Sequence, residues 1–273
     1  MNIRIPSFKK TVLVTGIAIL SIPSFAQQNQ LSLFNLKDVK LHTGLFEEAM
    51  YTDLDYILQM EPDRLLAPFL REAGLQPKAE SYPNWENTGL DGHIGGHYLT
   101  ALAQMYASAG SDEALQRLNY MIGELKKAQD ANGNGYVGGI PDSKRIWKEI
   151  SEGKINAGGF SLNGGWVPLY NIHKTYAGLR DAYLIAGNEE AKQMLIDLTD
   201  WMIDITANLS EAQIQEMLKS EHGGLNETFA DVYKITGDKK YLDLAYDFTQ
   251  KQVLDPLEHE KDILNGMHAN TQI

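Results

Sequence analysis

Tyr183-Leu-Ile-Ala-Gly187-Asn188 ends one segment of helical periodicity and begins the next. The same pattern of Tyr, three residues, Gly and a polar residue occurs in Tyr106-Ala-Ser-Ala-Gly110-Ser111 and in Tyr233-Lys-Ile-Thr-Gly237-Asp238. A Gly at this place supplies the left-handed residue that ends a helix, and the Ser, Asn or Asp after it caps the following helix. The three stretches therefore predict three helical hairpins, each burying its apolar face against its neighbours.

Apolar residues at helical spacing give the expected bounds of the helices. The first expected helices are residues 45–58, 63–73, 97–109 and 112–130, followed by the hairpins around Gly187 and Gly237 and a last helix from Lys261. Residues 131–167 are expected to be a long glycine-rich loop, and no strong strand is predicted anywhere. The fold class is therefore all-α. A closed ring of helix pairs would be about half built by the third hairpin, so we expect the chain to be part of a larger protein.

The amino-acid composition of the chain excludes several classes of protein. Apolar residues make up 43% of the chain and charged residues 22%, which is typical of a folded domain. The net charge of −12 argues against a nucleic-acid partner, because binding to phosphates needs clustered Lys and Arg. The chain has no Cys, which excludes disulfides and a lipid-anchored lipoprotein.

The N-terminus carries an export signal. Residues 1–26 begin with basic side chains, continue with an apolar run over 11–22 and end in the small-x-small site Ser24-Phe25-Ala26. The run is too short for a membrane anchor, so we expect a signal peptide that is cut after Ala26 and a periplasmic or secreted protein. Residues 27–43 are then a linker or N-terminal arm, and residues 44–273 form the helical domain.

The loops between hairpins are long and rich in Trp, Tyr, His, Asn, Asp and Gly, whereas the turns within hairpins are short. In a ring of hairpins these long loops lie at one end. Aromatic faces stack on sugar rings and polar groups bind hydroxyls, so the loops predict a carbohydrate pocket. The candidate substrate-binding residues are His93, Trp166, His173, Glu221, His222, Asn226 and His268.

Two motifs that resemble metal sites are incomplete. The stretch that begins at Asp130 matches the start of a calcium loop, but its twelfth position is Pro141 instead of a bidentate Glu. His93 and His97 are four residues apart, but two glycines separate them and the Glu of the zinc-protease motif is missing. We therefore predict no metal ligands in this chain.

Five segments together resemble the β-L-arabinofuranosidase group of glycoside hydrolases, families 127 and 146. The segments begin at Gly89 (GLDGHIGGHYLTALA), Asn134 (NGYVGGIP), Trp166 (WVPLYNIHKTYAG), Glu221 (EHGGLNE) and Leu264 (LNGMHANTQ). The resemblance implies an (α/α)6-barrel catalytic domain, followed in complete members by β-sandwich domains. It also implies that His173, His222 and His268 contact the sugar.

The chain departs from this family in one respect. The resemblance implies a Cys nucleophile held with further Cys and a Glu on zinc, and a Glu acid/base, all in the later half of the barrel. This sequence has no Cys, so we expect the catalytic residues to lie beyond Ile273 and the chain to bind no zinc. We expect an inactive N-terminal part of an enzyme that acts on plant-derived, arabinose-containing oligosaccharides or polysaccharides.

Two alternatives stay open. Another α/α-toroid enzyme, such as an unsaturated-uronyl hydrolase or a sugar epimerase, could use Asp91, Glu221 and Glu227 as acid and base. Activity without zinc or thiol would favour it. A non-catalytic sugar-binding half-barrel is the second alternative, favoured by a stable monomer that binds arabinose without cleaving it.

Overall fold

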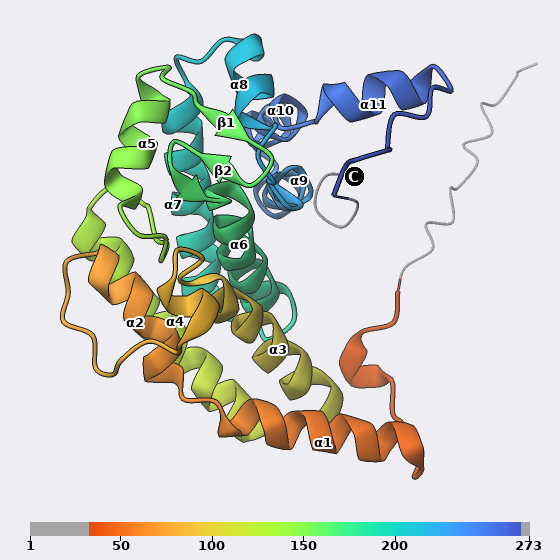
Figure 1. Cartoon of the computed structure of the whole chain (residues 1–273). Coiled ribbons are helices and arrows are strands. Elements are labelled where there is room, and N and C mark those ends of the chain that lie inside the picture. Colours follow the sequence, from red (N-terminus) through yellow and green to blue (C-terminus); the bar gives the residue numbers. More distant parts are fainter. Residues whose placement is uncertain (1–32, 269–273) are drawn as a thin grey trace, which may run out of the picture. The chain divides into compact units, whose positions relative to one another are not determined.

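The computed structural model describes residues 33–268, which fold mainly into α-helices (Figure 1). The all-α class is confirmed. The helices are α1 Leu45–Gln59, α2 Pro62–Glu72, α3 His93–Ala109, α4 Asp112–Asn132, α5 Ser143–Ser151, α6 Pro168–Leu184, α7 Glu189–Thr206, α8 Glu211–Met217, α9 Leu225–Thr236, α10 Lys239–Asp247 and α11 Lys251–Glu258. The expected signal peptide lies outside the described residues. Within residues 33–268, none of the helices combines the length and apolar character that crossing a membrane requires.

The Tyr-x3-Gly stretches form the predicted helix ends. Gly110, Gly187 and Gly237 have φ angles of +69°, +74° and +75°. The N–H of each glycine donates to the carbonyl of the Tyr four residues earlier, over 3.1, 2.9 and 2.7 Å. The side chain of the next residue, whether Ser111, Asn188 or Asp238, accepts a backbone N–H from the first turn of the following helix. Local sequence thus fixes all three hairpin turns.

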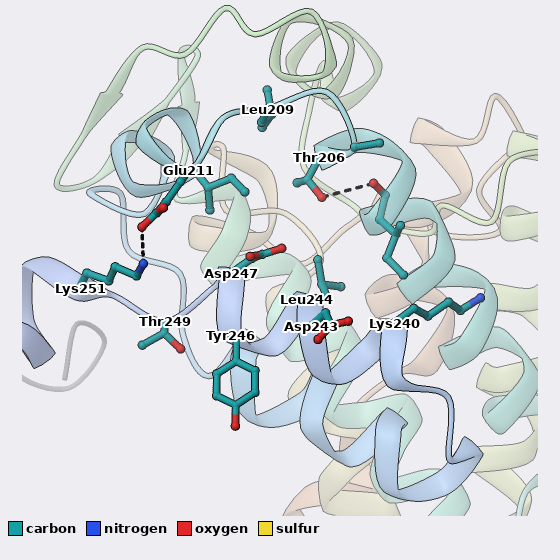
Figure 2. A pocket seen from close by; sticks show the side chains of 13 residues that line it. Thr206, Leu209, Glu211, Lys240, Asp243, Leu244, Tyr246, Asp247, Thr249 and Lys251 are labelled. Carbon is teal, nitrogen blue, oxygen red and sulfur yellow. Dashed lines mark hydrogen bonds and ion pairs between the residues drawn. The ribbon is translucent and has the colours of Figure 1, made fainter.

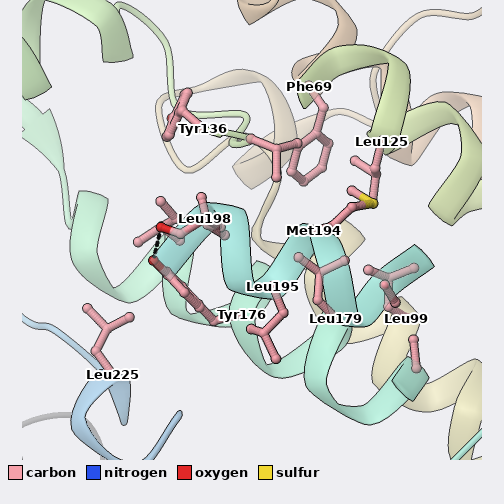
Figure 3. Close-up of a cluster of buried hydrophobic side chains, with 14 of the residues drawn as sticks. Phe69, Leu99, Leu125, Tyr136, Tyr176, Leu179, Met194, Leu195, Leu198 and Leu225 are labelled. Carbon is pink, nitrogen blue, oxygen red and sulfur yellow. Dashed lines mark hydrogen bonds between the residues drawn. The ribbon is translucent and has the colours of Figure 1, made fainter. Parts of the chain in front are cut away.

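The hairpins α3–α4, α6–α7 and α9–α10 pack side by side. The first helices are in contact in the order α3, α6, α9, and α4 contacts α7. The core between them is apolar (Figure 3), and Tyr176 from α6 is fully buried within it. Its hydroxyl donates to the carbonyl of Leu198 over 2.6 Å, which satisfies a polar group that burial would otherwise penalise.

Two glycines let α3 and α6 approach each other closely. A Cβ atom at position 96 would lie 2.3 Å from the carbonyl carbon of Lys174, and a Cβ at position 178 would lie 2.6 Å from the carbonyl oxygen of Gly96. Only a residue without a side chain fits at either place, because these neighbours are backbone atoms. We call this contact the glycine seam.

Four expectations about the elements were wrong. Helix α3 begins at His93 and not at residue 97, and α8 between the second and third hairpins was not expected. The loop 131–167 contains α5 and a small antiparallel sheet of the two-residue strands β1 Ala157–Gly158, β2 Ser161–Leu162 and β3 Gly165–Trp166. The last described helix is α11, and residues 261–268 form turns and coil.

The helix expected from Lys261 fails for a local reason. Gly266 has a φ angle of +83°, and the Met267 N–H donates to the carbonyl of Leu264 in a turn. The Leu264 N–H donates to the carboxylate of Asp262, which competes with helical hydrogen bonding. The N-terminal arm also contains a short 3₁₀ turn, η1 Leu36–Asp38.

Candidate functional site

The starts of α6 and α9 and the loop before α3 are held together by hydrogen bonds. The Tyr170 N–H donates to the carbonyl of Glu221 over 3.2 Å. The side-chain amide of Asn171 donates to the carbonyls of Leu90 and Asp91, over 2.9 Å each. The long loops before these three helices therefore lie at one end of the hairpins, as the sequence predicts (Figure 1).

His93 is tied into the start of α3 by a buried carboxylate. Glu86, from the 3₁₀ turn η2 Asn84–Asn87, accepts the N–H groups of Gly92 and Ile94 over 2.9 and 3.0 Å. Its carboxylate also lies 2.8 Å from Nδ1 of His93, a residue that is only 3% exposed. Glu86 thus satisfies helix N–H groups that have no partner within the helix, which is why α3 begins four residues earlier than its apolar periodicity indicates.

His173, on the second turn of α6, lies against the glycines before α9. A Cβ atom at Gly223 would lie 2.5 Å from its Nδ1, and a Cβ at Gly224 would lie 3.2 Å from its Nε2. Burial and the nearby Lys174 ammonium lower the pKa of His173 to about 3. The imidazole is therefore neutral at pH 7, with one nitrogen as donor and one as acceptor.

His97 lies beside His93, although it is not among the candidate residues named from the sequence. Its side chain is exposed, and its ring centroid lies 6.2 Å from that of His93. Desolvation by its neighbours and the charge of Lys174 lower the pKa of His97 to about 4. Spacing was a usable signal, because a residue four positions after His93 lies on the same face of a helix once the helix is known to begin at His93.

His222 and His268 complete this end of the hairpins. His222 is buried, its Nδ1 lies 3.4 Å from the carbonyl of Ser220, and burial lowers its pKa. His268 contacts the carboxylate of Glu221 through Nδ1, and its ring lies 5.5 Å from that of Phe160. We call His93, His97, His173, His222 and His268 the histidine cluster.

The remaining candidates lie at the margin of the cluster. Trp166, in β3, is 37% exposed, and a Cβ at Gly89 would lie 3.7 Å from its indole. The following residue, Val167, has a φ of +37°, a strained conformation for a β-branched side chain. For Asn226 the described side-chain contact is local, since its Oδ1 accepts the N–H of Glu227 over 3.0 Å.

The carboxylates considered as acid and base differ in their surroundings. Asp91 is buried, and its two oxygens are held by Arg71 and by the N–H of Gly89, over 2.9 Å each. Burial nevertheless raises its pKa. Glu227 is mostly exposed and forms an ion pair with Arg180 over 3.3 Å. Glu221 is buried and engaged by His268, so of these three carboxylates it is the one in contact with the cluster.

A groove of about 600 Å³ lies elsewhere, between α7, α8 and α10 (Figure 2). It is lined by charged side chains around an apolar floor, and Glu211 and Lys251 form an ion pair at its edge. None of the candidate site residues lines it. The groove is therefore separate from the histidine cluster.

Comparisons with known proteins agree with the resemblance seen in the sequence. Residues 38–273 match the family described as "Beta-L-arabinofuranosidase, GH127 catalytic domain". Among solved structures, the chain is similar to a GH127 beta-L-arabinofuranosidase from Geobacillus stearothermophilus T6, with 16% sequence identity and a TM-score of 0.48. This similarity covers 84% of the present chain and 34% of the other, so the present chain spans about a third of that protein's length. No curated protein matches the chain.

Proposed function

Because the chain belongs to the GH127 β-L-arabinofuranosidase catalytic-domain family, which matches residues 38–273, we propose that it binds an L-arabinofuranosyl unit at the histidine cluster. The observation that carries this proposal is the placement of the neutral imidazoles of His97 and His173 at the same end of the hairpins as the buried carboxylate of Glu221. A neutral imidazole offers one donor and one acceptor, and a carboxylate offers acceptors, which together suit the hydroxyls of a sugar. Trp166 adds an exposed aromatic face beside the cluster.

The zinc chemistry that the sequence resemblance implies does not fit the residues of this chain. That chemistry requires thiolates, and the chain has no Cys. Across residues 33–268, no group of three or more His, Asp or Glu side chains is placed to hold a metal ion. We therefore propose that this polypeptide alone binds the sugar without cleaving it.

We also propose that the protein is exported and that its glycan comes from plants. The signal-like residues 1–26 support cleavage after Ala26 and a periplasmic or secreted location. An exported protein of this family would meet arabinose-containing plant glycans outside the cell. N-terminal sequencing of the protein purified from its secreting host tests the cleavage, and a first residue other than Gln27 would contradict it.

Binding can be tested with methyl β-L-arabinofuranoside and the purified chain, by saturation-transfer NMR. We expect His173→Ala and His268→Ala each to weaken binding about tenfold, because each removes hydrogen bonds worth about 1–1.5 kcal/mol. His42→Ala, at an exposed position before α1, is the matched control and should bind like the parent chain. Equal affinity of all four proteins would contradict the placement of the site, and no binding by the parent would contradict the proposal itself.

Hydrolysis is tested separately by incubating the chain with an arabinofuranosyl substrate, with and without added zinc. We expect no release of arabinose above a protein-free blank, because the thiol nucleophile is missing. Release that His173→Ala abolishes would show that this chain holds catalytic residues of its own.

A further inference from the structure

The ammonium of Lys174 differs from every other cationic side chain that the structure describes. Among residues 33–268, each of the other lysines and arginines is exposed, or has a carboxylate within 4.0 Å, or both. Lys174 is partly buried and has no carboxylate of the described residues within that distance. Partial burial of an unpaired charge costs free energy, so this arrangement requires an explanation.

The neighbours of Lys174 are neutral. Its Nζ lies 3.3 Å from Nδ1 of His173 and 4.2 Å from the centroid of the Tyr170 ring. Because an ammonium can only donate, Nδ1 of His173 is the acceptor in this contact and Nε2 carries the ring proton. Glu221 is the carboxylate that acts on Lys174 electrostatically, but it lies beyond ion-pair distance and its Oε1 is engaged by His268. Burial lowers the pKa of Lys174, as expected for an ammonium without a close counter-ion.

The position of Lys174 is fixed by backbone packing. Its carbonyl group forms one side of the glycine seam, so the stem of the side chain starts from a part of α6 that cannot shift relative to α3. His97, one residue after Gly96 on α3, carries an exposed ring beside this charge, and the charge acts on the pKa of that ring. An ammonium with an adjacent neutral imidazole offers several hydrogen-bond donors to an incoming anion.

We propose that Lys174 and His97 bind the carboxylate of a uronic-acid residue, so that the glycan bound at the histidine cluster is acidic. This inference rests on the proposed function, since it names the substrate class of the same site. The chain carries a net charge of −12, so an anionic sugar would be repelled by most of its surface and attracted to a cation that has no carboxylate close by. Trp85, 59% exposed with its ring 5.9 Å from that of His93, supplies an aromatic face for the sugar ring.

The test compares D-galacturonate with its methyl ester, which has the same ring and no charge. We expect the purified chain to bind galacturonate at least about tenfold more tightly than the ester, and the difference to shrink as sodium chloride is raised. Lys174→Met should remove the preference, and Lys174→Arg should keep most of it. Lys144→Met, at an exposed lysine of α5 that has no carboxylate of residues 33–268 within 4.0 Å, is the matched control.

Three outcomes would overturn the inference. One is equal affinity for galacturonate and its ester, and another is an undiminished preference in Lys174→Met. The third is binding of acetate as tight as that of galacturonate, because it would show that the site binds anions in general and does not recognise the sugar.

Binding of methyl β-L-arabinofuranoside by the same samples distinguishes the acidic-glycan inference from the proposed function. If the arabinoside binds and galacturonate shows no preference, only the acidic-glycan inference fails; if the arabinoside does not bind, the proposed function fails. Arabinoside binding by Lys174→Met also shows that this variant is folded.

Discussion

At the scale of the residue, the surroundings of His173 and His97 decide the charge of these two side chains. His173 and His97 have pKa values lowered to about 3 and about 4, first by desolvation and then by the cation of Lys174. The sequence indicated that histidines gather at one end of the hairpins, and Glu221 and His268 do come into contact. It could not indicate the role of Glu86, because a carboxylate caps α3 from a separate turn and no local pattern records that contact.

The lowered pKa of His173 predicts a pH dependence of stability. An unfolded histidine takes up a proton near pH 6.5, whereas the folded one does so near pH 3, so between these values the unfolded state binds more protons. Stability therefore falls as the pH falls through this window, by about 1.4 kcal/mol per pH unit for one such group. In urea titrations at pH 7 and 5, His173→Asn should lose less stability on acidification than the parent, by on the order of 1–2 kcal/mol.

The matched control is His42→Asn, which removes an exposed histidine outside the cluster. It should keep the acid sensitivity of the parent. The same loss of stability on acidification in the parent and in His173→Asn would show that another group is responsible.

At the scale of the element, the sequence predicted the hairpins well and the loop 131–167 poorly. The Tyr-x3-Gly stretches encode their turns through neighbouring residues, so they are readable without tertiary contacts. Helix α5 was not predicted, because the glycines on either side of it led us to expect a loop over the whole stretch. Its buried residues Ile146, Trp147 and Ile150 nevertheless have helical spacing. The helix expected from Lys261 shows the opposite error, since turn-forming contacts around Gly266 override the apolar pattern.

The glycine seam predicts opposite effects for two Gly-to-Ala changes in helices. Gly96→Ala places a methyl group against the backbone of α6 and should destabilise the chain by about 1–3 kcal/mol or more. Gly123→Ala, in α4, meets no atom within 4 Å and should stabilise the chain by about 0.5–1 kcal/mol through helix propensity. Urea denaturation measures both, and a Gly96→Ala variant as stable as the parent would contradict the close approach.

The cap that follows each Tyr-x3-Gly stretch also predicts a measurable effect. The side chain of Asn188 accepts the N–H of Ala191 over 2.8 Å at the start of α7. Asn188→Ala should therefore lower the free energy of unfolding by about 1 kcal/mol, and Asn188→Ser should restore most of it. Equal loss in both variants would indicate that the contact of Asn188 with Asn119 matters more than the cap.

At the scale of the whole molecule, α1 exposes a group of large apolar side chains. Leu45 and Phe46 are 82% and 81% exposed, and Tyr56 on the same helix is 63% exposed. Contiguous exposed apolar surface favours association. The sequence could predict that these residues belong to a helix but not which of them would be covered, because coverage depends on packing between distant elements.

This surface predicts reversible self-association. Sedimentation velocity of the purified chain should show a weight-average mass that rises with concentration over the micromolar range. The double variant Leu45→Ser, Phe46→Ser should shift the distribution toward the monomer, while Leu254→Ser, at an exposed leucine of α11, should not. A single monomeric boundary for the parent at every concentration would show that α1 is not a contact surface.

The glycine seam has a mechanical consequence as well. With backbone against backbone, α3 and α6 have no layer of flexible side chains between them to absorb a displacement. A displacement of one helix therefore displaces the other, and the two helices move together as one rigid unit. The backbones at His97 and Lys174 therefore keep a constant separation, so any adjustment to a bulkier ligand has to come from the two side chains or from the loops that surround them.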